Sequence, residues 1–205
     1  MLQLNAVSAR TLDLLRLVGK QKCLSDFYLV GGTSLALQIG HRLSYDFDFF
    51  STKKSDLFLV ENELLQLPNV VLKNTSEYAL FMEIKNVKLD ILNYPYPFLA
   101  EPILFEGIKL ANKEDIAAMK LKTVMNRGSK RDFYDIYFLL HDFTLQEMID
   151  LFEKKYKNIN KFAVQRSLVY FEDAEHQEDI VLLKEKTLTW QHVKQTLINE
   201  VKKMV

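Results

Sequence analysis

The chain has 205 residues, 48% of them hydrophobic, which is enough for one substantial core or for a core with an attached helical lobe. Lysine plus arginine equals aspartate plus glutamate at 27 each, so the balanced charge excludes a globally basic nucleic-acid-binding or membrane-surface protein. The single cysteine, Cys23, excludes an intrachain disulfide framework and a thiolate-rich zinc site.

The distribution of apolar residues along the chain bears on localisation. No apolar run approaches the ~20 residues that span a bilayer. Polar residues near the N-terminus interrupt the apolar core that a signal peptide needs. We therefore expect a cytoplasmic protein that does not associate with membranes.

The first half of the chain alternates helical and strand periods in the order αβαβαββ. The predicted elements are a helix at 4–18, a strand at 27–30, a short helix at 35–39, a strand at 45–50, a helix at 54–67 and strands within 70–93. Thr33 or Ser34 is the expected cap of the short helix, which Gly40 ends, and Lys85-Asn86 is the expected hairpin turn. This pattern predicts an α/β (α+β) lobe with a small mixed sheet.

The second half is predicted to be helical almost to its end. Helix starts are expected at four capping residues, Asn112, Ser129, Thr144 and Thr189. The change of period near Pro95 predicts an α/β lobe over residues 1–100 and a C-terminal helical lobe over residues 101–205. Phe162, Tyr170 and Trp190 are predicted to pack in the core of the helical lobe.

Asp46 and Asp48 are two residues apart in a predicted strand. Their carboxylates therefore point to one face, while Tyr45, Phe47 and Phe49 face the core. Like charges held this close repel unless a cation neutralises them, and a hard divalent ion such as magnesium takes oxygen ligands of this kind. The alternative is an amphipathic edge strand with a solvated acidic face.

Asp90 and the Gly31-Gly32 pair extend this hypothesis. If the strand of Asp90 lies beside that of Asp48, three acids converge as in a two-metal phosphoryl or nucleotidyl transfer site; otherwise Asp90 is a surface residue. Gly31-Gly32, between a strand and a helix, either offers backbone amides to a phosphate or is only a turn.

Two residues of the loop before the acidic strand are further candidates. Arg42 can bind phosphate or brace an acid. The Ser44 hydroxyl can contact a phosphate, act as a nucleophile, or satisfy backbone groups in the turn.

The first motif of the nucleotidyltransferases called the AbiEii/AbiGii toxin family, within the DNA polymerase β-like superfamily, resembles two segments of this chain, Gly31–Ser34 and Arg42–Phe49. Asp115–Leu121, which contains Lys120, and Lys130–Ile136 look like the family's later lysine and aspartate motifs. The resemblance covers nearly the whole chain.

The resemblance implies a nucleotidyltransferase lobe, a helical lobe that contributes to the active-site cleft, a nucleoside triphosphate as co-substrate, and Mg²⁺ (or Mn²⁺). It also implies frequent service as the toxin of a toxin–antitoxin pair, with a cognate antitoxin as partner. Some members of the family modify the acceptor end of transfer RNA; for this chain transfer RNA or another RNA, a protein hydroxyl and a small molecule all stay open as the acceptor. From the residues and the resemblance together, the expected metal ligands are Asp46, Asp48 and Asp90. The expected catalytic residues are these three with Lys120 and Asp135. The expected nucleotide-binding residues are Gly31, Gly32, Thr33, Ser34, Arg42, Ser44, Lys120 and Asp132.

Local patterns bear on the later motifs too. Lys120 falls inside an apolar helical arc, where it either binds the triphosphate or sends its ammonium out to water. Asp132 follows Ser129 by three residues and can be a capping-box acid. Asp135 lies one turn deeper on an apolar helix, where pairing with Lys120 would balance its charge. Asp135 is therefore the first choice for the functional aspartate, and Asp132 the second.

Three alternatives stay open at this point. Arg127, Lys130 and Arg131, at the turn between two predicted helices, either receive phosphates or form a solvated turn. A phosphotransferase would use similar groups, although the protein kinase motifs are missing. A catalytically silent relative would instead act by binding an antitoxin or RNA.

Overall fold

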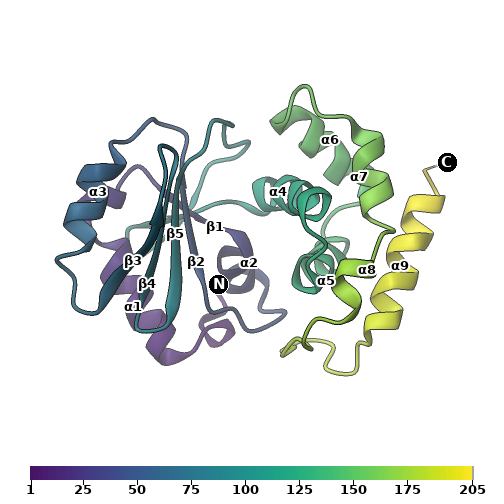
Figure 1. The fold of residues 1–205 in the computed structure, drawn as a ribbon. Coiled ribbons are helices and arrows are strands. Elements are labelled where there is room, and N and C mark those ends of the chain that lie inside the picture. The colour runs from purple at the N-terminus through teal and green to yellow at the C-terminus, as the bar shows by residue number, and fades with distance from the viewer. Residues whose placement is uncertain (205) are drawn as a thin grey trace. The chain divides into compact units, whose positions relative to one another are not determined.

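The computed structural model describes residues 1–204, and the chain divides into two compact units, one ending at Asn112 and the other beginning at Lys113 (Figure 1). The predicted division at residue 100 is therefore too early. Residues 101–112 belong to the first unit because they include two short strands of its sheet. These strands could not be predicted from the sequence, because each has only three residues, too few to show the alternation of apolar and polar residues that marks a strand.

The first unit is an α/β unit. Its elements are η1 (Leu4–Ala6), α1 (Ala9–Gly19), η2 (Lys22–Leu24), β1 (Tyr28–Val30), α2 (Gly31–Ile39), β2 (Phe47–Ser51), α3 (Leu57–Leu64), β3 (Val70–Thr75), β4 (Ala79–Ile84), β5 (Val87–Asn93), β6 (Ile103–Phe105) and β7 (Ile108–Leu110). The strands form one sheet in the order β3-β4-β5-β2-β1-β7-β6. The β2–β5 and β1–β7 pairs are parallel and the others are antiparallel. The predicted mixed sheet is confirmed.

The hairpin between β4 and β5 turns at the predicted residues. Lys85 and Asn86 have positive φ angles of 49° and 68°, the left-handed conformation that a tight two-residue hairpin requires. The turn pairs Ile84 with Val87 and sets the register of the two strands. This register extends to Asp90, which lies three residues further along β5.

One face of the sheet packs into the hydrophobic core. Phe47, Phe49, Leu89 and Ile91 are at most 1% exposed and share that face, which α1 and α3 cover in Figure 1. The intervening residues of β2 and β5 point to the other face. Tyr45 was expected in the core but is 45% exposed, because β2 begins two residues after it.

Helix α2 follows β1 directly and begins at Gly31, ahead of both predicted caps. Thr33 and Ser34 therefore lie inside the helix, where their hydroxyls bond to other parts of the unit. Gly40 ends the helix as predicted, with a left-handed φ of 64°.

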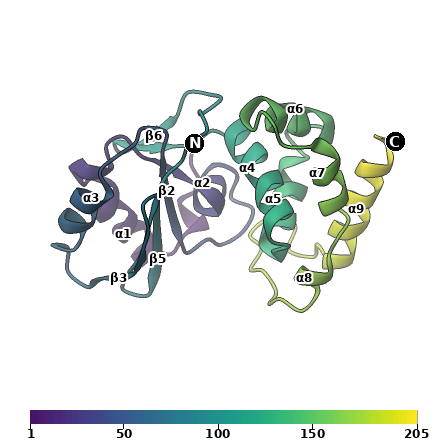
Figure 2. The ribbon, with the colours of Figure 1, turned by 45° about the horizontal axis from the view of Figure 1, so that its top comes forward.

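The second unit is helical, and its helices pack together in Figure 2. They are α4 (Lys113–Asn126), α5 (Lys130–Leu139), α6 (Leu145–Lys155), α7 (Lys161–Ser167), α8 (Glu172–Glu175) and α9 (Trp190–Lys202). Thr144 forms a capping box with Glu147, and the Thr189 hydroxyl accepts a hydrogen bond from the backbone N–H of His192. The four predicted helix starts all agree with the structure.

A buried ion pair joins α4 to α6. Lys155 Nζ lies 2.7 Å from Asp115 Oδ1, and both side chains are 0% exposed. Burial lowers the pKa of Lys155, and the Asp115 carboxylate opposes that effect. None of the helices within residues 1–204 is long and apolar enough to cross a membrane.

Candidate active site

Asp48 and Asp90 lie next to each other on neighbouring strands. Strands β2 and β5 are parallel, and Asp48 is the register partner of Asp90. Both residues are half-buried and alternate with fully buried neighbours, so their side chains point away from the core on the same face of the sheet. The strand of Asp90 thus lies where a three-acid site would need it.

Asp46 stands just before β2 and is half-buried. Its backbone carbonyl accepts a short hydrogen bond from the Thr33 hydroxyl, which ties the residue to α2. Within residues 1–204, no three His, Cys, Asp or Glu side chains are already gathered around one metal position. The structure therefore brings Asp48 and Asp90 together and places Asp46 two residues from Asp48.

Gly31 allows the Asp48 carboxylate to rest against the start of α2. Its φ is +67°, and a Cβ atom added here would lie 2.3 Å from Asp48 Oδ2, a separation that real Cβ atoms essentially never show. A side chain is thus excluded both by the backbone conformation and by the acid. This contact places a carboxylate at the positive end of a helix dipole, where negative groups are stabilised.

Gly32 makes room for Arg42 in the same way. A Cβ atom on Gly32 would lie 2.3 Å from Arg42 Nη2 and 3.4 Å from Ser44 Oγ. Arg42 is 3% exposed, and its Nη1 donates to the Leu43 carbonyl at 3.0 Å. The structure thus assigns Arg42 to bracing the loop that precedes the acidic strand.

Thr33 and Ser44 fix that loop through a buried hydroxyl pair. Their oxygens are 2.8 Å apart, and Thr33 also donates to the Asp46 carbonyl. A hydroxyl has one hydrogen, so Ser44 must be the donor to Thr33. Ser34 Oγ donates at 3.2 Å to the carbonyl of Ala111. The Thr33 and Ser34 hydroxyls therefore bond to backbone carbonyls, and the Ser44 hydroxyl is held by the Thr33 side chain.

The helical unit holds a second charged cluster. Lys120 Nζ lies 2.7 Å from Asp132 Oδ1 and 2.5 Å from Asp135 Oδ2. The three residues are 6%, 2% and 0% exposed, respectively. The predicted pairing of Lys120 with Asp135 is confirmed, and the alternative in which the ammonium reaches water is wrong.

Asp132 does not act as the predicted capping-box acid. Among the described residues Ser129 receives no side-chain cap bond, and Asp132 binds Lys120 instead. The capping prediction was wrong because the helix turns the Asp132 carboxylate inward, where a buried ammonium attracts it more strongly than a partly solvated helix end. Both acids of α5 therefore hold the same lysine.

The basic residues at the α4–α5 turn have different roles. Lys130 is 5% exposed, and its Nζ donates to the backbone carbonyl of Gln177 at 2.5 Å. The Gln177 side chain accepts from the Lys130 backbone N–H at 2.9 Å and donates to the Gly128 carbonyl at 3.2 Å. Lys130 therefore braces the turn. No sequence motif indicated Gln177, because its partners are mostly backbone atoms.

Arg127 and Arg131 are both exposed at this turn. Arg127 is the one that faces the Lys120 cluster. Its side chain is 72% exposed, and its Nε lies 3.6 Å from Asp132 Oδ2. That carboxylate oxygen is buried and has no hydrogen-bond partner among residues 1–204. Arg127 thus lies at the solvent side of the Lys120 cluster.

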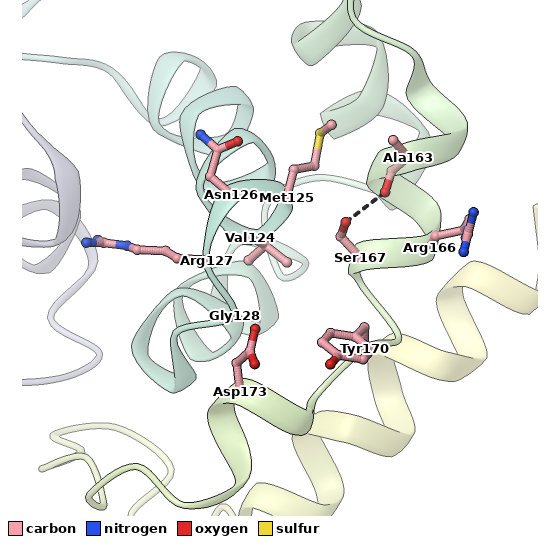
Figure 3. A pocket seen from close by; sticks show the side chains of 10 residues that line it. All are labelled: Val124, Met125, Asn126, Arg127, Gly128, Ala163, Arg166, Ser167, Tyr170 and Asp173. Carbon is pink, nitrogen blue, oxygen red and sulfur yellow. Dashed lines mark hydrogen bonds between the residues drawn. The ribbon is translucent and has the colours of Figure 1, made fainter.

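A pocket of about 360 Å³ opens beside the same turn (Figure 3). Residues from α4, the α4–α5 turn, α7, the segment between α7 and α8, and α8 line it: Val124, Met125, Asn126, Arg127, Gly128, Ala163, Arg166, Ser167, Tyr170 and Asp173. Its volume falls within the ~300–1,000 Å³ that is usual for small-ligand sites.

Two aromatic residues of the helical unit lie outside its core. Tyr170 is 51% exposed and Phe162 is 64% exposed, so their predicted core positions are wrong.

Comparisons with known proteins match this architecture. Residues 14–203 fit the family described as "Nucleotidyl transferase AbiEii toxin, Type IV TA system". The uncharacterized protein aq_aa25 of Aquifex aeolicus (strain VF5) is 42% identical over 164 residues, which cover 76% of this chain and 80% of that protein.

Two solved structures share the fold. JHP933 from Helicobacter pylori is 22% identical, with a TM-score of 0.52 and coverage of 100% of this chain and 96% of that chain. MenT4, a nucleotidyltransferase toxin from Mycobacterium tuberculosis H37Rv, is 16% identical, with a TM-score of 0.50 and coverage of 95% and 86%.

Proposed function

This chain belongs to the AbiEii nucleotidyl transferase toxin family, and we propose that it transfers a nucleotidyl group from a nucleoside triphosphate to an acceptor hydroxyl with Mg²⁺ (or Mn²⁺) at Asp46, Asp48 and Asp90. Its membership confirms the resemblance seen in the motifs and makes the protein a nucleotidyltransferase. The observation that carries the proposed site is the in-register pair Asp48–Asp90, with the Asp48 carboxylate against Gly31.

The donor set of these residues fits magnesium. Asp48 and Asp90 present hard carboxylate oxygens from adjacent strands, and Asp46 adds a third acid nearby. Magnesium usually keeps several waters and takes one or two protein carboxylates plus substrate phosphates, so the protein does not need a complete cage. When bound, the ion would offset phosphate charge and polarise the α-phosphoryl group.

The residues of the first unit supply the remaining parts of the reaction. The N-terminus of α2 at Gly31 and Gly32 offers backbone N–H groups to a phosphate. The acceptor oxygen bonds to the α-phosphorus, the bond from that phosphorus to the pyrophosphate oxygen breaks, and pyrophosphate leaves. The hydroxyl proton passes to a carboxylate, and Asp90 is the candidate base if Asp46 and Asp48 are the metal ligands.

We assign the Lys120 cluster to nucleotide binding in this proposal. Asp132 and Asp135 hold the ammonium from two sides, which fixes its position without a flexible solvated stem. A fixed cation can offset charge that develops on the leaving pyrophosphate. In this proposal both aspartates serve as positioning residues for Lys120.

The acceptor and the cellular role belong to the same proposal. The family description names a Type IV toxin–antitoxin system, which supports a toxin with a cognate antitoxin. We propose RNA, either transfer RNA or another RNA, as the acceptor and the cytoplasm as the compartment. RNA offers the terminal hydroxyl that the reaction requires.

One labelling experiment tests this assignment. The protein is incubated with magnesium, total cellular RNA and each triphosphate, labelled either at the α-phosphorus or at the γ-phosphorus. Transfer of the α label to RNA, with release of pyrophosphate and loss of transfer in Asp48→Asn, is the expected result. Transfer of the γ label would indicate a phosphotransferase. Transfer of neither label to RNA, protein or small molecules would indicate a silent binding protein.

A further inference from the structure

The pocket beside the α4–α5 turn has an apolar interior and a charged rim. Val124, Met125 and Ala163 supply apolar surface, and the ring of Tyr170 is half-exposed. In Figure 3 Val124 and Tyr170 point towards each other across the pocket, and the guanidinium groups of Arg127 and Arg166 extend outward on opposite sides. An apolar group, such as one that stacks on the Tyr170 ring, is therefore suited to the inside, and negative groups are suited to the outside.

Polar groups in the lining restrict the ligand further. Asn126 offers an amide that both donates and accepts hydrogen bonds, and Asp173 offers a carboxylate that accepts them. The negative charge of Asp173 disfavours a phosphate inside the pocket but suits the N–H groups on the edge of a base. Gly128 allows this carboxylate to lie close, since a Cβ atom there would lie 3.0 Å from Asp173 Cβ.

Arg127 connects the pocket to the Lys120 cluster. It lines the pocket and also lies 3.6 Å from Asp132 Oδ2, the buried oxygen next to Lys120. Val124 stands one helical turn after Lys120 on α4. A phosphate that contacts Arg127 would therefore lie close to residues assigned above to the nucleotide.

We propose that this pocket binds one unpaired nucleobase of an RNA acceptor, while the flanking phosphates contact Arg127 and Arg166. The inference rests on the proposed function, because it takes RNA as the acceptor class. Single-stranded RNA is commonly held by stacking of exposed bases on aromatic rings and by cations along the backbone. Tyr170 is the stacking residue in this assignment.

Fluorescence anisotropy with the full chain tests the proposal in the absence of triphosphate. The probes are a short fluorescein-labelled single-stranded RNA and the same sequence as a blunt duplex. Tyr170→Ala should weaken single-strand binding about tenfold, which equals ~1.4 kcal/mol. Tyr170→Phe keeps the ring and loses only the hydroxyl bond to Glu172, so it should bind like the wild type. Arg166→Ala should reduce the salt dependence of binding by the equivalent of about one phosphate contact.

Tyr78→Ala is the matched control, because it removes a ring with a similar exposure of 57% from the first unit. Equal single-strand affinity in Tyr170→Ala and Tyr78→Ala would overturn the proposal. So would an equal loss of affinity for the single strand and the duplex. If the wild type transfers no α label but its RNA binding still depends on Tyr170, the proposed function fails and the pocket assignment stands.

Discussion

Gly31→Ala probes the contact between α2 and the acid pair. The φ of +67° costs an alanine roughly 1–2 kcal/mol. The new methyl group must also move from 2.3 Å to beyond 3.0 Å from Asp48 Oδ2, so the carboxylate or the start of α2 has to shift. A misplacement of about 1 Å in a catalytic group can cost about 100-fold in rate. We expect a turnover reduced about 100-fold, measured as label transfer under saturating triphosphate.

Gly107→Ala separates the steric effect from the backbone effect. Gly107 also has a positive φ, +87°, but among the described atoms nothing lies within 4 Å of an added Cβ. Both variants should lose roughly 1–2 kcal/mol in urea unfolding through backbone strain, and Gly107→Ala should keep normal turnover per folded molecule. Normal turnover in Gly31→Ala would refute the assignment of Asp48 to the reaction centre. An equal loss of turnover per folded molecule in both variants would refute it too.

Three further predictions concern charged and titrating groups. Asp48→Asn and Asp90→Asn should each abolish metal-dependent transfer while thermal stability stays level or rises, because repulsion between the carboxylates is relieved; full activity in both would contradict the metal site. Lys120→Met should cost ~3–5 kcal/mol in urea unfolding because it removes the cation between two buried acids, whereas Lys122→Met, at a half-buried position of the same helix, should cost less than ~1 kcal/mol; equal costs would contradict the buried cluster. Burial and Glu185 raise the pKa of Tyr137 from 10.0 to about 12. The protonated Tyr137 hydroxyl therefore stabilises the folded state fully below pH 10, and this contribution to the free energy of unfolding is lost as pH rises towards 12. Tyr137→Phe should flatten that part of the stability curve, and an unchanged curve would count against the shift.

The sequence predicted the elements whose local signals agree with their tertiary setting. The alternation of Phe47 and Phe49 with acids placed β2 with one face in the core, and the capping box at Thr144 marked the start of α6. The helix start of α2 was misplaced because the sequence suggested caps at Thr33 and Ser34, whereas their hydroxyls serve Ser44 and Ala111. Local capping rules cannot anticipate partners that come from loops distant in the sequence.

The acid pair shows where sequence patterns reach their limit. The period of β5 indicated the face of Asp90, but only strand order could make it a neighbour of Asp48. The need for glycine at 31 and 32 could be suspected from a turn, yet its physical cause is the approach of Asp48 and Arg42. Contacts between segments that are distant in the chain therefore determine which acids lie together and where glycine is required, and the periodicity of the sequence does not show these contacts.

The choice between Asp132 and Asp135 rested on the premise that one of them has a purely local role. The structure removes that premise, since Lys120 Nζ contacts both carboxylates and the three residues are at most 6% exposed. Two buried acids around one ammonium leave an excess of one negative charge within these three groups, and the exposed Arg127 side chain lies 3.6 Å from Asp132 Oδ2. Because Arg127 lines the pocket and also lies beside Asp132, Asp132 links a ligand of the pocket to Lys120.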